Sequence, residues 1–259
     1  LCRIVGNVSA WNGGGAYFST VVNCTITSNS APFGYGGGAA SATMNNCVVS
    51  SNSAVSGGGI YSGTTSNCVI YANAATYGGG AKYATVNNCT LSNNWAGDSG
   101  GGAYGGTLRN CAVVGNTAGS FGGGAYSATL KNCTVSGNAA IAGGGTYNGT
   151  MANSIIYYNS APNDPNFYGG TYGYSCTTPD PGGTGNLIGD PLLASAWHLA
   201  TNSPCIGTGN YADCSGVDLD GEAWLNPPCM GCDQVVTGAV TGVLSVAISA
   251  QSTNMAVGY

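Results

Sequence analysis

The chain has 259 residues, of which 46 are glycine, and only 5% of the residues carry a charged side chain. With four Lys and Arg residues in all, it cannot neutralise a run of phosphates or hold an anionic membrane surface, so we expect no nucleic-acid partner. No apolar run reaches the roughly 18 residues of a membrane-spanning helix, so we expect no membrane insertion. A hydrophobic content of 43% together with 16 tyrosines predicts a packed core rather than disorder.

Seven cysteines recur at a spacing of 21 to 23 residues through the first half of the chain. They stand at Cys2, Cys24, Cys47, Cys68, Cys89, Cys111 and Cys133. Ser154 occupies the next step of this series, and Cys176 the one after it. A fixed period of this length is typical of a solenoid, in which each repeat forms one coil.

Other residue types keep the same phase as the cysteines. Asparagine directly precedes most of them, a second asparagine follows five residues later, and a Gly-Gly-Gly triplet comes after that. The second series comprises Asn29, Asn52, Asn73, Asn94, Asn116 and Asn138. Apolar and polar residues alternate between these bends, which predicts short strands, and Asn and Gly tolerate the left-handed backbone of sharp bends. The sequence therefore predicts an all-β parallel β-helix with Asn and Cys ladders, whose buried thiols stay free.

Several short motifs resemble known families. The apolar-x-x-Asn units at 26–29, 49–52 and 135–138, together with Gly-Gly-Ala, resemble the repeats of chlamydial polymorphic outer-membrane proteins, which carry Phe where this chain has Val, Ile or Leu. The C-terminal part is similar to β-helix proteins of the choice-of-anchor type, through the segments at 174–179, 189–193, 198–199, 203–206 and 218–221. The chain departs from that type at Cys229-Met-Gly-Cys232, where an acidic Asp-x-Gly-Ala is usual. The resemblance implies a single right-handed parallel β-helix and specifies no activity.

The expected solenoid covers residues 1–234 in nine to ten coils. Its coils are regular over residues 1–167 and irregular over 168–234, where prolines mark longer loops. Cys205 is followed by Asn210 and Ala212 in the phase of the repeat, which predicts one more coil there.

Three cysteines fall outside the repeat. Cys214, Cys229 and Cys232 predict one disulfide with Cys214 as a partner, because twelve cysteines in a chain poor in Lys and Glu indicate an extracellular or cell-surface setting. A zinc site made from these cysteines and His198, the single histidine, is the alternative.

Two aspartates form half of a calcium-loop pattern. Asp218 and Asp220 stand in Asp-Leu-Asp-Gly-Glu, but the remainder of the loop spacing is absent, so a structural turn is favoured over a calcium site. His198 lies in an apolar context and is expected to be structural. We therefore predict no cofactor.

Residues 235–259 change character. Leu244, Val246 and Ile248 alternate with small or polar residues, which predicts an extended β tail. The tail is either the start of an Ig-like domain, as the family resemblance suggests, or a strand that docks on a neighbouring subunit. The second reading predicts head-to-tail self-association into a fibre.

The distribution of acids argues against catalysis. Residues 1–160 contain one acid, Asp98, so no pair of carboxylates can act on a substrate along those coils. We expect a structural protein, such as a surface stalk, adhesin segment or fibre subunit, and not an enzyme. The alternative is a carbohydrate-binding or degenerate polysaccharide-active β-helix, with glycans stacked on a tyrosine series. That series comprises Tyr17, Tyr61, Tyr104, Tyr126 and Tyr147.

Overall fold

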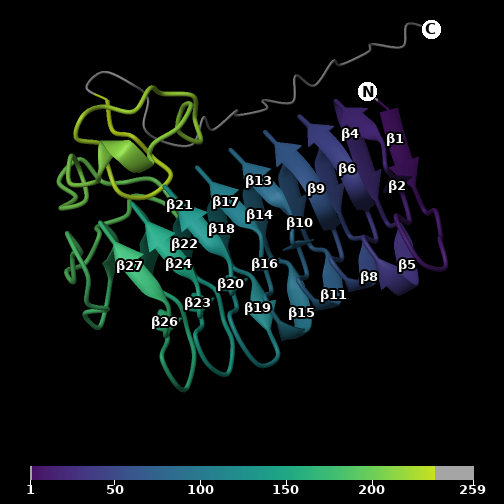
Figure 1. Ribbon diagram of the computed structural model, residues 1–259, viewed down its shortest axis with the longest axis horizontal. Helices are drawn as coiled ribbons and strands as arrows, with labels where there is room; N and C mark the ends of the chain where they lie inside the picture. Colours follow the sequence, from purple (N-terminus) through teal and green to yellow (C-terminus); the bar gives the residue numbers. More distant parts are fainter. Residues whose placement is uncertain (1, 237–259) are drawn as a thin grey trace, which may run out of the picture.

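The computed structural model describes residues 2–236 and forms a solenoid of short parallel strands (Figure 1). Successive coils contribute strands to three sheets of different lengths, and each strand pairs with its counterparts in the neighbouring coils. The predicted all-β parallel β-helix is confirmed. Within the described residues the helical elements amount to one turn, η1 (Tyr211–Asp213), and none is long and apolar enough to cross a membrane.

The first sheet has nine strands, one from each successive coil. They are β1 (Cys2–Val5), β4 (Cys24–Thr27), β7 (Val48–Ser50), β10 (Val69–Tyr71), β14 (Thr90–Ser92), β18 (Ala112–Val114), β22 (Thr134–Ser136), β25 (Ile155–Tyr157) and β28 (Cys176–Thr177). Eight full turns of chain separate the first strand from the last, and the chain beyond them does not continue the regular stack.

The other two sheets hold five and fourteen strands. The five-stranded sheet comprises β5 (Ser30–Tyr35), β8 (Ser53–Ser56), β11 (Ala74–Tyr77), β15 (Trp95–Ser99) and β19 (Thr117–Ala118). The fourteen-stranded sheet comprises β2 (Ala16–Tyr17), β3 (Thr20–Val22), β6 (Ala39–Asn45), β9 (Ile60–Ser66), β12 (Ala81–Lys82), β13 (Thr85–Asn87), β16 (Ala103–Tyr104), β17 (Thr107–Arg109), β20 (Ala125–Tyr126), β21 (Thr129–Lys131), β23 (Thr146–Tyr147), β24 (Thr150–Ala152), β26 (Phe167–Tyr168) and β27 (Thr171–Gly173).

Left-handed residues make the corners between the strands. The asparagine before each cysteine has a positive φ, for example 53° at Asn67 and 48° at Asn88. Asparagine adopts this conformation more readily than most residues with a Cβ. The first glycine of each triplet is also left-handed, and the third lies against the next coil. A Cβ on Gly80 would lie 2.6 Å from the carbonyl oxygen of Gly102, so this corner admits only glycine.

The predicted asparagine ladder lies buried inside the coil and closes its own hydrogen bonds. The Oδ1 atom of Asn94 accepts from the backbone N–H and the side-chain amide of Asn73, both at 3.0 Å. Its own amide donates to Asn116 Oδ1 at 2.9 Å and to the carbonyl oxygen of Ile70 at 3.0 Å. This pattern repeats along the ladder, so each buried amide is satisfied by its neighbours in the stack.

The cysteine ladder follows the prediction as far as Cys133 and then differs from it. The sulfur of Cys68 accepts the backbone N–H of Cys47 at 3.2 Å, and Ser154 Oγ accepts that of Cys133 in the same way. The next position is taken by Ser175, whose Oγ accepts the N–H of Ser154. Cys176 lies instead in register with Ile155, so it points out of the coil. Because the repeat length varies by one residue, the period alone did not fix which face Cys176 occupies.

Residues 187–234, here called the C-terminal lobe, fold back over the side of the solenoid instead of adding further regular coils. Figure 1 shows the lobe in green and yellow beside β21 and β22. Corner asparagines hold it by donating to its backbone carbonyls, from Asn88 to Val217, Asn110 to Ser215 and Asn153 to Asn210, at 2.8 to 3.0 Å.

A second core lies between the lobe and the nine-stranded sheet. It joins Ile155 and Cys176 of the sheet to lobe residues. Those lobe residues are Leu199, Cys205, Cys229 and Met230. Cys205 therefore belongs to this lateral core and not to a further coil of the ladder, which corrects the expectation from its phase.

We expect Asn94→Ala to lower the free energy of unfolding by about 3 kcal/mol, because buried groups of Ile70, Asn73 and Asn116 in the two neighbouring coils each lose a hydrogen bond. Equilibrium unfolding in urea measures this. Asn93→Gly is the matched control, since Asn93 is exposed and has a φ of 52°, which glycine adopts freely. Its effect should stay within about 0.5 kcal/mol. Equal losses in the two variants would contradict a special role for the buried ladder.

Candidate functional site

Polar side chains capable of chemistry gather at three places in the described residues. Two are in the C-terminal lobe, around His198 and around Cys214, and one is on the coils, around Lys82. The tail residues Leu244, Val246 and Ile248 lie outside the described residues.

Asp218 is fully buried and organises the turn that follows it. Its Oδ1 accepts the backbone N–H groups of Asp220, Gly221 and Glu222 at 2.7 to 3.0 Å. Its Oδ2 accepts that of Gln234 at 2.8 Å. The two oxygens are thus occupied by four backbone donors, as a structural turn requires. The carboxylates of Asp218, Asp220 and Glu222 do approach one another, and burial beside Asp218 raises the pKa of Glu222.

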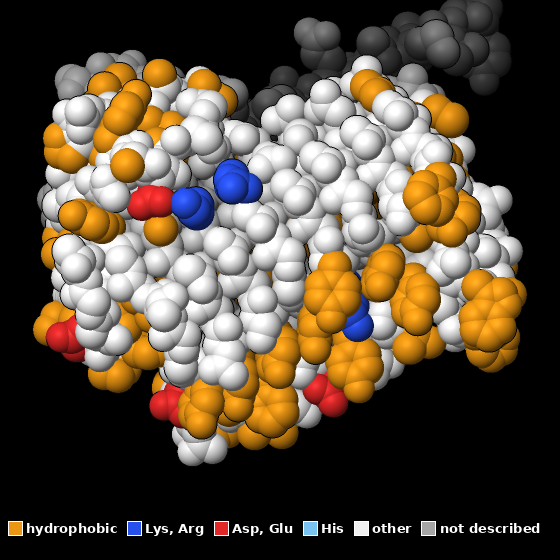
Figure 2. All heavy atoms as spheres, viewed as in Figure 1, with side chains coloured by type: hydrophobic (Ala, Val, Ile, Leu, Met, Phe, Trp, Pro, Cys, Tyr) orange, Lys and Arg blue, Asp and Glu red, His pale blue; other side chains and the backbone are white. Residues whose placement is uncertain are grey.

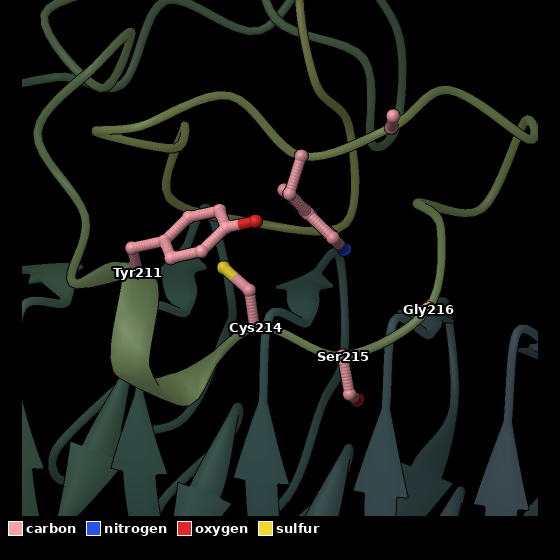
Figure 3. Close-up of a pocket in the computed structure, with 6 residues that line it drawn as sticks. Tyr211, Cys214, Ser215 and Gly216 are labelled. Carbon is pink, nitrogen blue, oxygen red and sulfur yellow. The ribbon is translucent and has the colours of Figure 1, made fainter.

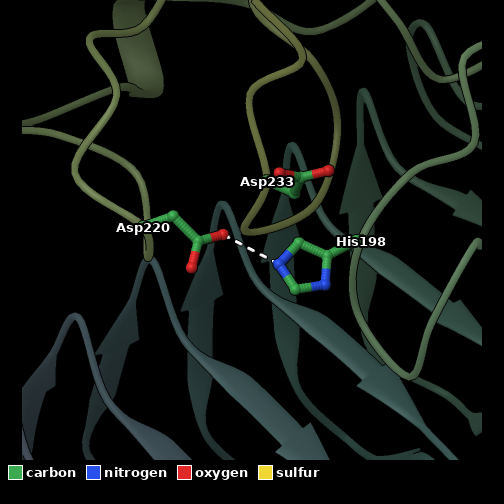
Figure 4. A group of neighbouring side chains, drawn as sticks. All are labelled: His198, Asp220 and Asp233. Carbon is green, nitrogen blue, oxygen red and sulfur yellow. Dashed lines mark hydrogen bonds and ion pairs between the residues drawn. The ribbon is translucent and has the colours of Figure 1, made fainter. Parts of the chain in front are cut away.

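His198 lies between the Ser195 hydroxyl and the Asp220 carboxylate, and Figure 4 shows the contact with Asp220. Its Nδ1 is 2.7 Å from Ser195 Oγ, and its Nε2 is 2.9 Å from Asp220 Oδ2. Ser195 Oγ also accepts the backbone N–H groups of Trp197 and His198, at 3.4 and 3.1 Å. Ser195, His198 and Asp220 thus stand in line, and the Ser195 hydroxyl also caps its own turn. These contacts join two segments of the lobe, and the structural role predicted for His198 stays a prediction.

The side chains that gather around His198 differ from those predicted for the zinc site. His198 is grouped with Asp220 and Asp233, whose ligand atoms all lie within 4.8 Å of one another, and not with the cysteines. Asp233 Oδ2 accepts the backbone N–H of Leu199 at 2.7 Å, and burial raises the pKa of Asp233. These three side chains could hold a divalent cation only by giving up the hydrogen bonds that fix the lobe.

The predicted disulfide of Cys214 is not formed. All twelve cysteines are free, and all of them lie in the described part of the chain. Cys214 faces a cavity of about 180 Å³ between Tyr211 and Trp224, and its sulfur accepts from Asn132 Nδ2 at 3.4 Å (Figure 3). Cys229 and Cys232 are fully buried at other contacts: Gln234 Nε2 donates to Cys229 Sγ, and the Cys232 N–H donates to Thr134. Cys214, Cys229 and Cys232, the three cysteines outside the repeat, therefore each have different contact partners.

The tyrosine series forms an aromatic strip on the surface of the fourteen-stranded sheet. The rings of Tyr104, Tyr126, Tyr147 and Tyr168 stack in order, with centroids 4.6 to 5.5 Å apart. Figure 2 shows hydrophobic side chains gathered along this side of the molecule. Because stacked rings cover one another's faces, this part of the strip offers mainly ring edges to a ligand.

Lys82 interrupts the stack and creates a different environment, which the sequence analysis missed. Its ammonium nitrogen lies 4.7 to 5.3 Å from the ring centroids of Tyr77, Tyr83 and Tyr104, and donates to Ser56 Oγ at 3.1 Å. Partial burial lowers the pKa of Lys82. The register of Lys82 with Tyr61 and Tyr104 is the signal that could have revealed it, since a ladder position places a lysine between tyrosines.

The ring of Tyr83 lies beside this lysine. Its Cδ1–Cε1 edge faces Gly105, where a Cβ would meet these two atoms at 2.7 and 2.8 Å. The rings of Tyr61 and Tyr104 stand at 77° and 85° to it, with centroids 6.2 and 5.7 Å away. Tyr83 remains 53% exposed between these two rings.

We expect Asp218→Ala to destabilise the lobe by about 3 kcal/mol, because four backbone donors lose their acceptor. Fluorescence of the buried Trp224 reports the loss. Asp220→Asn, which keeps a hydrogen-bonding group beside His198, is the milder control. The Tm of the unaltered chain should be the same in calcium and in EDTA, since the Asp218 oxygens are occupied. A calcium-dependent rise in Tm that Asp220→Asn abolishes would instead assign a calcium site.

Comparison with known proteins agrees with this architecture. No curated protein matches the chain. Residues 4–161, which cover most of the regular coils, match the family model described as the right handed beta helix region. The chain therefore belongs to the right-handed β-helix family.

Proposed function

We propose that this protein is an extracellular, non-enzymatic structural module, a rigid spacer of a cell surface or fibre. The observation that carries the proposal is the uninterrupted stack of nine strands with a self-satisfied asparagine ladder inside it. Each coil is bonded to both neighbours, so bending the rod requires buried hydrogen bonds to break.

Charge and composition support the same reading. Asp98 is the one acid in residues 1–160, so the coils present no carboxylate pair for glycan cleavage. The similarity of the C-terminal motifs to choice-of-anchor β-helix proteins, and of the repeats to chlamydial outer-membrane proteins, supports a surface location.

An antibody raised against the folded chain tests the location. Intact, unpermeabilised cells of the source organism should bind it, while a cytoplasmic marker stays unlabelled. Labelling that requires permeabilisation would refute the surface role.

Deletion of one coil tests the spacer role. Removing residues 24–46 joins Asn23 to Cys47 and keeps every ladder in phase, so the shortened chain should fold and reach the surface. Removing residues 24–34 breaks the phase and should prevent folding. Loss of surface display in the in-phase deletion, with folding intact, would show that the module does more than span a distance.

A second candidate, carbohydrate binding, is favoured by the exposed Tyr83 ring beside Lys82. An exposed aromatic face packs against a sugar ring, and the ammonium donates to ring or hydroxyl oxygens. Burial is the main cause that raises the pKa of Tyr104, and the nearby charge of Asp98 adds to it; the Asp98 carboxylate supplies an acceptor for hydroxyl groups. A neutral oligosaccharide matches a donor and an acceptor of opposite charge better than an acidic one does.

Titration calorimetry with cellohexaose and chitohexaose tests this candidate. Lys82→Gln and Tyr83→Ser should each weaken binding at least about tenfold, the loss of roughly 1.4 kcal/mol. Arg109→Gln is the matched control, because it removes the same charge elsewhere on the fourteen-stranded sheet. Equal binding by all four proteins, or no binding by the unaltered chain, would contradict a carbohydrate site at Tyr83 and Lys82.

A further inference from the structure

The stacked tyrosines of the surface strip form pairs of unequal geometry. Tyr147 of β23 is in register with Tyr168 of β26, and their rings stack with centroids 4.6 Å apart and planes 13° apart. Tyr126 and Tyr147 are also in register and nearly parallel, but their centroids are 5.5 Å apart. Tyr104 and Tyr126 are 4.8 Å apart and tilted by 24°. Tyr147 and Tyr168 are therefore the closest of the in-register tyrosine pairs in the strip.

Register decides which ring atoms meet. Side chains at equivalent positions of parallel strands leave the sheet on the same face and in the same direction. The hydroxyl of one ring and the carbons beside it therefore lie next to the same atoms of the other ring. Tyr35 and Tyr61 are also 4.6 Å apart, but Tyr35 pairs with Ser56 and Tyr61 with Ala40, so these two come from different sheets and register does not align their hydroxyls.

The Tyr147–Tyr168 pair is open to a reagent from solvent. Tyr168 is 45% exposed and Tyr147 is partly exposed. Within residues 2–236, Tyr168 is the last ring of the stack, and exposed side chains of this kind rotate quickly about their side-chain bonds. Phe121 packs on Tyr147 with centroids 4.8 Å apart, so Tyr147 is the more firmly held of the two rings.

We propose that Tyr147 and Tyr168 form an oxidative modification site, at which a one-electron oxidant joins the two phenols as dityrosine. The oxidant is hydrogen peroxide acting through a haem peroxidase. Each phenol gives up one electron and one proton, and the peroxide takes up both pairs and leaves as two molecules of water. The two phenoxyl radicals then form a carbon–carbon bond between ring carbons next to their oxygens. The hydrogens on these carbons move to the oxygens, which restores both phenols.

The fold supplies the proximity that this coupling needs. Two phenols held in contact react within one molecule, whereas separate tyrosyl radicals must first meet by diffusion. The new bond ties β23 to β26 and closes a loop of about 20 residues, so it restricts the unfolded chain. It adds a covalent strap between neighbouring coils, and it requires only the oxidant, so it does not depend on the surface location proposed above.

Peptide mapping of peroxidase-treated protein tests the site. Exposed thiols of the full chain are alkylated first, because a thiol such as that of the exposed Cys2 reduces phenoxyl radicals. The dilute protein is treated with hydrogen peroxide and a haem peroxidase, and the monomer is isolated and digested with pepsin. The expected product is a pair of peptides that has lost two hydrogen atoms and joins Tyr147 to Tyr168. An equal yield at the edge-on pair of Tyr83 and Tyr104, or dityrosine only between different molecules, overturns the proposal.

Single variants give a second readout, the dityrosine fluorescence of the isolated monomer. Tyr168→Phe keeps a stacked ring but removes the hydroxyl, so the yield of dityrosine should fall by about fivefold or more. Tyr211→Phe is the matched control, because Tyr211 is 51% exposed but lies on η1 of the C-terminal lobe, and it should keep the full yield. Equal yields in the two variants would show that exposure alone governs the coupling.

Unfolding separates proximity from the reactivity of tyrosine itself. A light-excited ruthenium complex with persulfate replaces the peroxidase here, because urea inactivates the enzyme. In concentrated urea the stack is lost while all 16 tyrosines remain, so the yield within one molecule should fall at least about tenfold. An unchanged yield in urea would contradict a site built by the fold.

Discussion

Everything in this molecule depends on identical residues stacking at the spacing of parallel strands, roughly 4.8 Å. A buried polar side chain is tolerated at that spacing only if each copy satisfies the next. Asparagine meets the condition because its amide both donates and accepts, so Asn73, Asn94 and Asn116 bond in sequence without water. Glycine meets a related condition at the third triplet position, where a Cβ would lie 2.6 to 2.7 Å from the next coil in most coils. These two requirements explain why Asn and Gly recur at fixed positions of the repeat.

The solenoid could be predicted from the sequence because its determinants lie within one repeat. Position in the period decides whether a residue is a corner, a core side chain or an outward side chain, and this held from Cys24 through Cys133. Cys176 is the exception, because its position in the period did not predict its face. The period varies between 21 and 23 residues, and a shift of one residue reverses the face of a strand. Only its pairing with Ile155 shows that it points outward.

The C-terminal lobe could not be predicted in the same way, because its contacts are specific to single residues. Nothing in the repeat distinguishes Asn88, Asn110 and Asn153, which bind lobe carbonyls, from Asn23 and Asn46, which bond to each other. The turn at Asp218 could be predicted from the sequence, since its bonds to residues 220–222 are local. The sequence also left Cys214, Cys229 and Cys232 as a group, whereas contacts across the lateral core separate them. Lys82 was missed for a related reason, as its tyrosine neighbours come from different coils.

The placement of the four basic residues has a consequence for the resistance of the folded chain to proteolysis. Arg3, Lys82, Arg109 and Lys131 each lie within a hydrogen-bonded strand, in β1, β12, β17 and β21. Trypsin-like proteases cut after basic residues and must first draw several residues of substrate into an extended, unpaired form. Each of the four basic residues lies in a strand that is hydrogen-bonded to at least one neighbouring coil. Lys131 also forms an ion pair with Asp213 of the lobe at 2.8 Å. Trypsin-like proteases therefore find few accessible cleavage sites in the folded chain.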